Sequence, residues 1–129
     1  MNEMIKEYGL PVIFHPHGTL TSGNGIDALD RFIDIGYECI YYGEGIDQRK
    51  MSDLTRGRCS IMGGIDTAST IYLGPDERVV KDTAKVIDDA DGSDFIFTCS
   101  CSVDAGLNKD RLKLMVDTVK RMGGGPGRD

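Results

Sequence analysis

The sequence has no tryptophan, only two histidines and no apolar run of the length that crosses a bilayer. A membrane-spanning helix needs about 20 mostly apolar residues, so the sequence predicts none. The first residues, Met1-Asn2-Glu3, do not resemble a secretory signal peptide, and we expect a cytoplasmic protein. Basic residues number 15 against 21 acidic ones, and a net charge of −6 argues against a nucleic-acid partner.

The rest of the composition describes a soluble globular protein of one domain. Of the 129 residues, 40% are hydrophobic and 28% charged, and 17 are glycines, which indicates many turns. The four cysteines are Cys39, Cys59, Cys99 and Cys101. In a chain without a secretory signal, cysteines are more often reduced thiols or metal ligands than disulfides.

Hydrophobic periodicity predicts four strands that alternate with helices. The expected strands are 12–15, 38–43, 59–62 and 94–98, and the expected helices are 26–35, 48–56, a strong helix that begins near Pro75, and 109–122. We expect one domain over 1–122 and a flexible glycine-rich tail over 123–129. Tyr41 and Tyr42 alternate on the second strand, where core packing explains them adequately.

Four consecutive β-α units predict an α/β fold with a parallel sheet, because each helix must cross back before the next strand begins. Four units fill half of a TIM (β/α)8 barrel, which requires about 250 residues. Parallel strands place their carboxyl ends on one edge, where ligands and catalytic groups collect. At this edge the sequence has six candidate residues: His15, His17, Glu44, Asp66, Cys99 and Cys101.

Both histidines stand at the end of the first strand, on either side of Pro16. Proline keeps the preceding residue extended, and residues i and i+2 of an extended chain point to the same side. The two imidazoles are therefore predicted to converge on one point. Imidazole combined with the thiolate of a downstream cysteine suits zinc, whereas two satisfied polar groups at a strand end are the simpler alternative.

Several motifs together resemble one family. They are His-x-His-Gly at 15–18, Gly-Gly-Ile-Asp at 63–66, Gly-Pro-Asp-Glu-Arg-Val at 74–79, and the cysteines that follow Phe-Ile-Phe at 95–97. In order and spacing they resemble the carboxyl-terminal half of the uroporphyrinogen decarboxylase superfamily, and most closely its cobamide-dependent (methylcobamide:thiol) methyltransferases. The resemblance covers about residues 10–122 and implies a TIM barrel.

The resemblance also implies a zinc ion, held by a His-x-Cys on one strand and a cysteine on the last strand. By position, His15 matches the histidine and Cys101 the last cysteine, while His17 stands where the first cysteine is usual. A neutral imidazole in place of a thiolate makes the site more positive, so a bound thiol should be more acidic and its thiolate less nucleophilic. Cys99 is an alternative ligand or a small buried residue at the strand end.

Two carboxylates at the same edge are weaker candidates. Glu44 and Asp66 stand where they could orient an imidazole or accept a proton, and surface acids at loop starts are the simpler explanation. The functional hypothesis is a zinc-dependent methyltransferase, or the carboxyl half of one, that moves a methyl group from a corrinoid on a partner protein to a zinc-activated small-molecule thiol.

The alternative is a truncated, non-catalytic metal-binding module or a split-enzyme subunit. A decarboxylase-like lyase is disfavoured, because in the family the amino half supplies most groups that hold the substrate carboxylates. Both edge strands are apolar, and an exposed apolar edge invites pairing. We therefore expect a homodimer or a complex with an amino-half partner.

Overall fold

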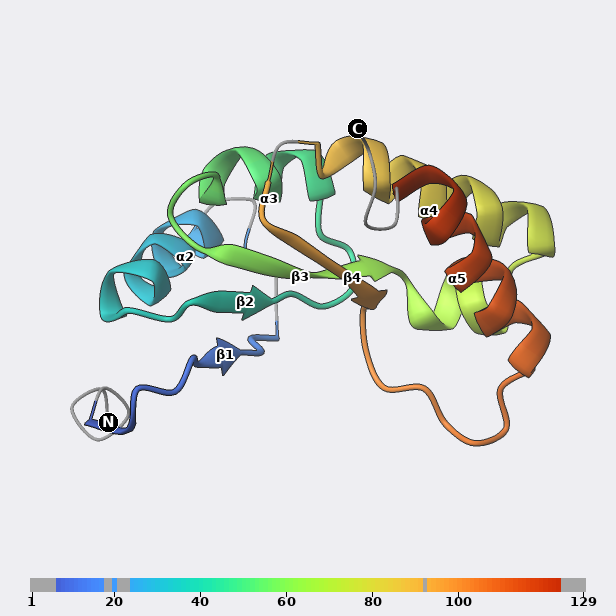
Figure 1. Ribbon diagram of the computed structural model, residues 1–129, viewed down its shortest axis with the longest axis horizontal. Coiled ribbons are helices and arrows are strands. Elements are labelled where there is room, and N and C mark those ends of the chain that lie inside the picture. The colour runs from blue at the N-terminus through green and yellow to red at the C-terminus, as the bar shows by residue number, and fades with distance from the viewer. Residues whose placement is uncertain (1–6, 18–19, 21–23, 92, 124–129) are drawn as a thin grey trace.

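The computed structural model describes residues 7–17, 20, 24–91 and 93–123, which form a parallel sheet flanked by helices (Figure 1). In chain order the elements are β1 (Ile13–Phe14), α2 (Asn24–Ile35), β2 (Cys39–Tyr41), α3 (Gln48–Thr55), β3 (Ser60–Ile65), the π-helical turn η1 (Thr67–Tyr72), α4 (Asp76–Asp89), β4 (Phe95–Cys99) and α5 (Lys109–Gly123). The sheet order is β1-β2-β3-β4, and every pairing is parallel. The predicted α/β fold is confirmed, and it is consistent with part of a TIM barrel.

The helices cover one face of the sheet. Because strand order follows chain order and crossovers between parallel strands are right-handed, successive helices fall on the same side, as α3, α4 and α5 do in Figure 1. On that side Ile40 and Ile61 are fully buried and pack with Leu29 of α2 and Met51 of α3. A second buried cluster joins the end of β3 to α4 and α5; its members include Ile65, Val79 and Met115.

The opposite face of the sheet has apolar side chains that stay exposed. Ile13 of β1 is 55% exposed and Ile96 of β4 is 49% exposed, and these two strands are the edges of the sheet. In a closed barrel this face would line the interior and the two edges would be paired. The described residues thus leave uncovered the surface that a complete barrel would bury.

Strand β3 is longer than predicted, because it continues through Gly63 and Gly64 to Ile65. A Cβ on Gly63 would lie 2.2 Å from Cζ of Tyr42, and one on Gly64 would lie 2.0 Å from the carbonyl oxygen of Thr98. The two glycines allow close approach of neighbouring atoms on both sides of the strand. We expected them to end the strand, and that expectation was wrong because their role depends on cross-strand contacts.

Other boundaries differ by a few residues. β1 ends at Phe14, one residue before the predicted end; Pro16, which has no N–H, follows closely. Gly36, with φ of +100°, ends α2 as predicted. η1 was not predicted. Of the predicted tail, 124–129 lies outside the described residues.

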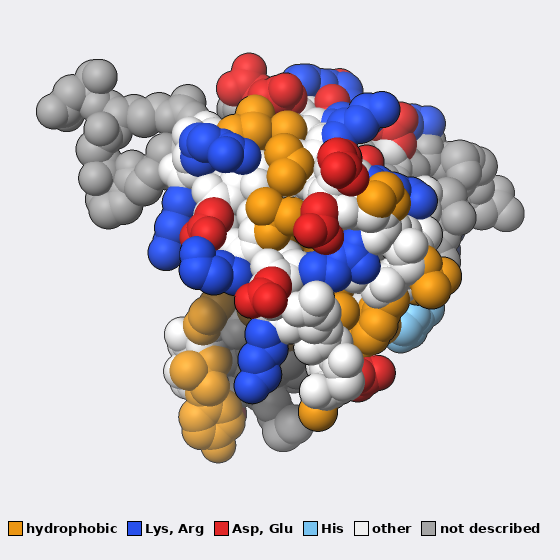
Figure 2. Space-filling view, turned by 90° about the vertical axis from the view of Figure 1, so that its right-hand side faces the viewer, with side chains coloured by type: hydrophobic (Ala, Val, Ile, Leu, Met, Phe, Trp, Pro, Cys, Tyr) orange, Lys and Arg blue, Asp and Glu red, His pale blue; other side chains and the backbone are white. Residues whose placement is uncertain are grey.

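The outer surface carries mixed charge. Figure 2 shows acidic and basic side chains interspersed over the end of the molecule formed by α4 and α5. Several are paired within one helix, as Arg78 is with Asp82 (3.2 Å) and Lys113 with Asp117. In the described part of the chain, no helix is both long and apolar enough to cross a membrane.

Candidate functional site

A cavity of about 250 Å³ lies at the carboxyl edge of the sheet. It is lined by His15, His17, Gly43, Glu44, Ser100 and Cys101. These residues follow β1, β2 and β4. The parallel sheet therefore brings together residues that are far apart in sequence; His15 and Cys101, for example, are separated by more than 80 residues. Four of the six candidate residues share this cavity.

His15 is held by Tyr41 in two ways. Its Nδ1 lies 2.6 Å from the carbonyl oxygen of Tyr41, and its ring stacks on the Tyr41 ring with centroids 4.2 Å apart. A carbonyl oxygen only accepts, so Nδ1 carries a hydrogen, and in the neutral imidazole the lone pair is then on Nε2. The His17 ring meets the His15 ring edge-on, with centroids 4.8 Å apart. With the hydrogen on Nδ1, His15 could bind a metal through Nε2.

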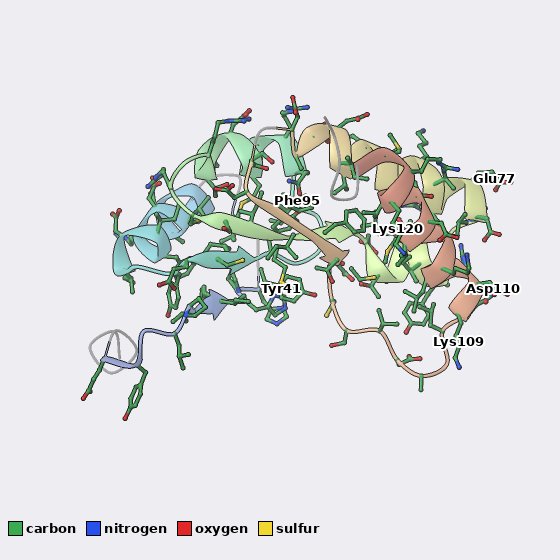
Figure 3. All side chains as sticks on the ribbon, viewed as in Figure 1. Tyr41, Glu77, Phe95, Lys109, Asp110 and Lys120 are labelled. Carbon is green, nitrogen blue, oxygen red and sulfur yellow. The ribbon has the colours of Figure 1, made fainter. Side chains whose placement is uncertain are left out.

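Tyr41 also reaches the other side of the cavity. The residue ends β2 (Figure 3), and its hydroxyl donates a 2.8 Å hydrogen bond to the carbonyl of Cys99 at the end of β4. Burial raises the pKa of the Tyr41 phenol, with the nearby Cys101 and Cys99 acting in the same direction, so the hydroxyl stays a donor at neutral pH. One side chain therefore ties the histidine segment to the cysteine segment. The sequence predicted only core packing for Tyr41. Its contact with Cys99 depends on the register of the strands, which the sequence does not show.

A buried hydroxyl pair fixes the backbone at Cys101. The N–H of Cys101 donates to Oγ1 of Thr67 (3.0 Å), and the N–H of Thr67 donates to Oγ of Ser100 (3.2 Å). Thr67 and Ser100 are 4% and 1% exposed. The buried hydroxyls of Thr67 and Ser100 are thus hydrogen-bonded to each other and to backbone groups, one of which is the N–H of Cys101. Both were missed by sequence reasoning, since neither threonine nor serine has a motif that marks this role.

The two remaining candidates lie elsewhere. Cys99 is buried, its Sγ is 3.8 Å from Sδ of Met115, and burial raises the pKa of its thiol. It belongs to the core cluster between β4 and α5 and does not line the cavity. The side chain of Asp66 accepts a 2.6 Å hydrogen bond from the N–H of Ser69 and so caps η1. Asp66 lines a second, larger cavity that adjoins the first.

The donor chemistry of the smaller cavity fits zinc. Imidazole nitrogen and cysteine sulfur are the ligands that zinc prefers. His15 and His17 supply two imidazoles, and Cys101 supplies one thiol. Among the residues that the structure describes, no three His, Cys, Asp or Glu side chains already form a group that could hold a metal ion. Binding would therefore require these side chains to converge from their present positions, and their role as ligands stays a prediction.

The adjacent tyrosines offer a matched test of how firmly this edge is held. Tyr41→Phe removes the donor to Cys99 and should lower the free energy of unfolding by about 1–3 kcal/mol, because a part-buried carbonyl loses its partner. The Tyr42 hydroxyl is buried without a partner in the described structure, so Tyr42→Phe should be neutral or stabilising. Urea unfolding followed by circular dichroism measures both. Equal losses in the two variants would contradict the assigned bond.

Comparison with protein-family models gives a match over most of the chain. A family model described as uroporphyrinogen decarboxylase (URO-D) matches residues 1–122, which is nearly the whole chain. Among curated proteins, none matches. The match extends over all four strands and over every residue that lines the smaller cavity.

Proposed function

Because this chain belongs to the uroporphyrinogen decarboxylase family, we propose that it is a zinc-dependent methyltransferase, or the carboxyl half of one, that methylates a small-molecule thiol. One observation carries the proposal: His15, His17 and Cys101 line a single cavity at the ligand-binding edge of a parallel sheet. The methyl donor would be a corrinoid carried by a partner protein.

In this proposal, three residues would bind the zinc ion and a fourth would accept a proton. His15 offers Nε2, since Tyr41 holds its Nδ1, and His17 and Cys101 complete a set of three protein ligands. When bound there, zinc would hold the acceptor thiol as a thiolate at neutral pH. Glu44 is exposed at the cavity wall, where its carboxylate could accept the proton that the thiol releases. Asp66 caps η1 in the neighbouring cavity and is not assigned a role in proton transfer.

Two measurements test this function together. Elemental analysis should find one zinc per chain, and the loaded protein should demethylate methylcobalamin when a thiol is added. Cys101→Ala should lose both properties, whereas Cys59→Ala, whose side chain lies away from the cavity, should keep both. Zinc bound at one per chain with no thiol-dependent demethylation, alone or with a partner, would rule out methyl transfer.

The uncovered face of the sheet favours a second candidate, a subunit of a split enzyme or a non-catalytic metal-binding module. Ile13 and Ile96 stay exposed on strands that would be paired in a closed barrel. A split subunit would bind zinc but gain activity only when an amino-half partner is supplied. Activity of the isolated chain argues for a complete methyltransferase, and activity restored by the partner argues for a split-enzyme subunit. Zinc binding with no activity in either case argues for a non-catalytic module.

Assembly is proposed to follow from the same edges. Two copies related by a two-fold axis could pair each β4 with the partner's β1 and so close one eight-stranded barrel. Light scattering should then report about twice the 14.1 kDa of one chain. Ile96→Lys should shift the protein toward monomer, because a charge on an edge strand opposes pairing. Val116→Lys, on an exposed face of α5, is the matched control. A stable monomer at micromolar concentration without added partner would contradict closure by a second copy.

A further inference from the structure

Cys101 lies beyond the last paired residue of the sheet. β4 ends at Cys99, and the N–H of Ser100 still donates to the carbonyl oxygen of Ile65 at the end of β3 (3.0 Å). The next N–H, that of Cys101, donates instead to a side chain, Oγ1 of Thr67 (3.0 Å). The residue that carries the thiol is therefore joined to β3 and η1 through a hydroxyl group and not through the strand ladder.

The Thr67 hydroxyl contacts both polar groups of the Cys101 backbone. Besides accepting from the N–H, Oγ1 donates toward the carbonyl oxygen of Cys101 at 3.4 Å. Ser100 supports the contact, because its Oγ accepts from the N–H of Thr67 and lies 3.3 Å from Oγ1. Thr67 is buried and does not line the smaller cavity, so it acts on Cys101 from behind the cavity wall.

Thr67 itself belongs to a firmly anchored element. It is the first residue of η1, and π-helical turns are frequent at functional sites. The side chain of Asp66 caps the start of η1, and Arg111 of α5 donates to the carbonyl oxygen of Tyr72 at its other end (3.1 Å). Because both ends of η1 are held, a movement of the cysteine segment would break the contact with Thr67 and would not carry Thr67 along.

The backbone position of Cys101 decides where its sulfur can lie. A cysteine side chain has one heavy-atom torsion, so a fixed backbone confines Sγ to three staggered positions. The candidate zinc ligands must converge to bind a metal, and rotation about this torsion brings the thiol to a defined point only if the backbone stays in place. A residue that holds this backbone therefore also controls the placement of the thiol.

We propose that Thr67 is a positioning residue for Cys101, whose hydroxyl holds the backbone so that the thiol stays at the cavity wall it shares with His15 and His17, where it can serve as a ligand. The inference rests on the zinc site proposed above. The placement of the thiol can nevertheless be measured without metal.

Thr67→Val keeps the shape of the side chain and replaces its hydroxyl by a methyl group. We expect this variant to bind zinc about tenfold or more weakly, as is usual when a group that orients a metal ligand is lost. Thr67→Ser restores the hydroxyl and should bind zinc within about threefold of the wild type. Competition with a chromogenic chelator measures the affinities. In the cobalt-substituted protein, Thr67→Val should weaken the sulfur-to-cobalt absorption and Thr67→Ser should restore it.

Thr55→Val is the matched control for loss of a buried hydroxyl. Thr55 is fully buried at the end of α3, its Oγ1 donates to the carbonyl oxygen of Met51 (2.8 Å), and it lines neither of the two cavities at the carboxyl edge. The replacement should reduce stability but leave zinc affinity unchanged within about twofold. Wild-type zinc affinity in Thr67→Val, or equal weakening by Thr67→Val and Thr55→Val, would overturn the proposal.

Ser100→Ala serves as a second variant if Thr67→Val does not fold, which circular dichroism reports. It removes the oxygen that accepts the Thr67 N–H and so loosens the same contact from the other side. Zinc binding should again be weaker by about tenfold. Wild-type zinc affinity in a folded Ser100→Ala protein would contradict the positioning role.

Alkylation of the metal-free protein by iodoacetamide separates the positioning role from the proposed function. In a Cys59→Ala background, Cys101 is the remaining cysteine that is not buried, and mass spectrometry of its peptide follows the reaction. Thr67→Val should react about threefold or more faster, because the freed segment opens more often. Thr67→Ser and Thr55→Val should react at the wild-type rate. If the wild type binds no zinc but these rates differ as expected, the proposed function fails and the held thiol stands. Equal rates in all four proteins would overturn the positioning role whatever the zinc result.

Discussion

Alanine at His15, His17 or Cys101 is expected to lower zinc affinity by about a hundredfold or more, because each replacement removes one of only three protein bonds to the metal. All three line the same cavity, so each replacement should act on one site. Competition with a chromogenic chelator measures the affinity, and the visible spectrum of the cobalt-substituted protein reports whether a thiolate is still a ligand.

Cys99→Ala is the control for this series. Its side chain packs against Met115 in the core, so the replacement should reduce stability while leaving zinc affinity nearly unchanged. Urea unfolding beside each zinc titration separates the two effects. Stoichiometric zinc retained by Cys101→Ala but lost from Cys99→Ala would reverse the assignment of the cysteine ligand.

Gly64→Ala is expected to lower the free energy of unfolding by about 3 kcal/mol or more, because the new methyl group would lie 2.0 Å from a backbone oxygen of β4. Backbone on the paired strand cannot rotate away as a side chain can, so β3 and β4 must separate locally. The entropy that alanine removes from the unfolded chain, about 0.4–1 kcal/mol, is too small to offset this loss. The midpoint of urea unfolding measures the difference.

Gly43→Ala is the matched control for the glycine test. A Cβ at Gly43 meets nothing within 4 Å, and its backbone is not left-handed. The free energy of unfolding should therefore change by no more than about 0.5 kcal/mol. If Gly43→Ala and Gly64→Ala were equally destabilising, the close strand contact at Gly64 would not be the cause.

Local signals in the sequence were sufficient for most of the fold. Pro75 followed by Asp76 and Glu77 marks the start of α4, and Gly36 ends α2 with a left-handed backbone. Regular alternation of strand and helix fixed the sheet as parallel, and with it the edge where the candidate residues had to gather. These features depend on neighbours in sequence, which is why they could be predicted without coordinates.

The candidate site was only partly predictable. The sequence left Cys99 as either an alternative ligand or a small buried residue at the strand end, and β4 does end at Cys99. Cys99 lies in the core and Cys101 on the cavity. Where a strand ends is decided by pairing with its neighbour, and a single sequence does not contain that information.

The sequence by itself determined the order of strands and helices and the parallel sheet. It also determined that imidazole, thiol and carboxylate groups follow the strands at the carboxyl edge of that sheet. The tertiary structure alone decided which of those groups share a cavity and what holds them there. Tyr41 spans from His15 to Cys99, and Thr67 fixes the backbone of Cys101. Both depend on strand register, in which each residue's partner is set by packing of segments distant in sequence.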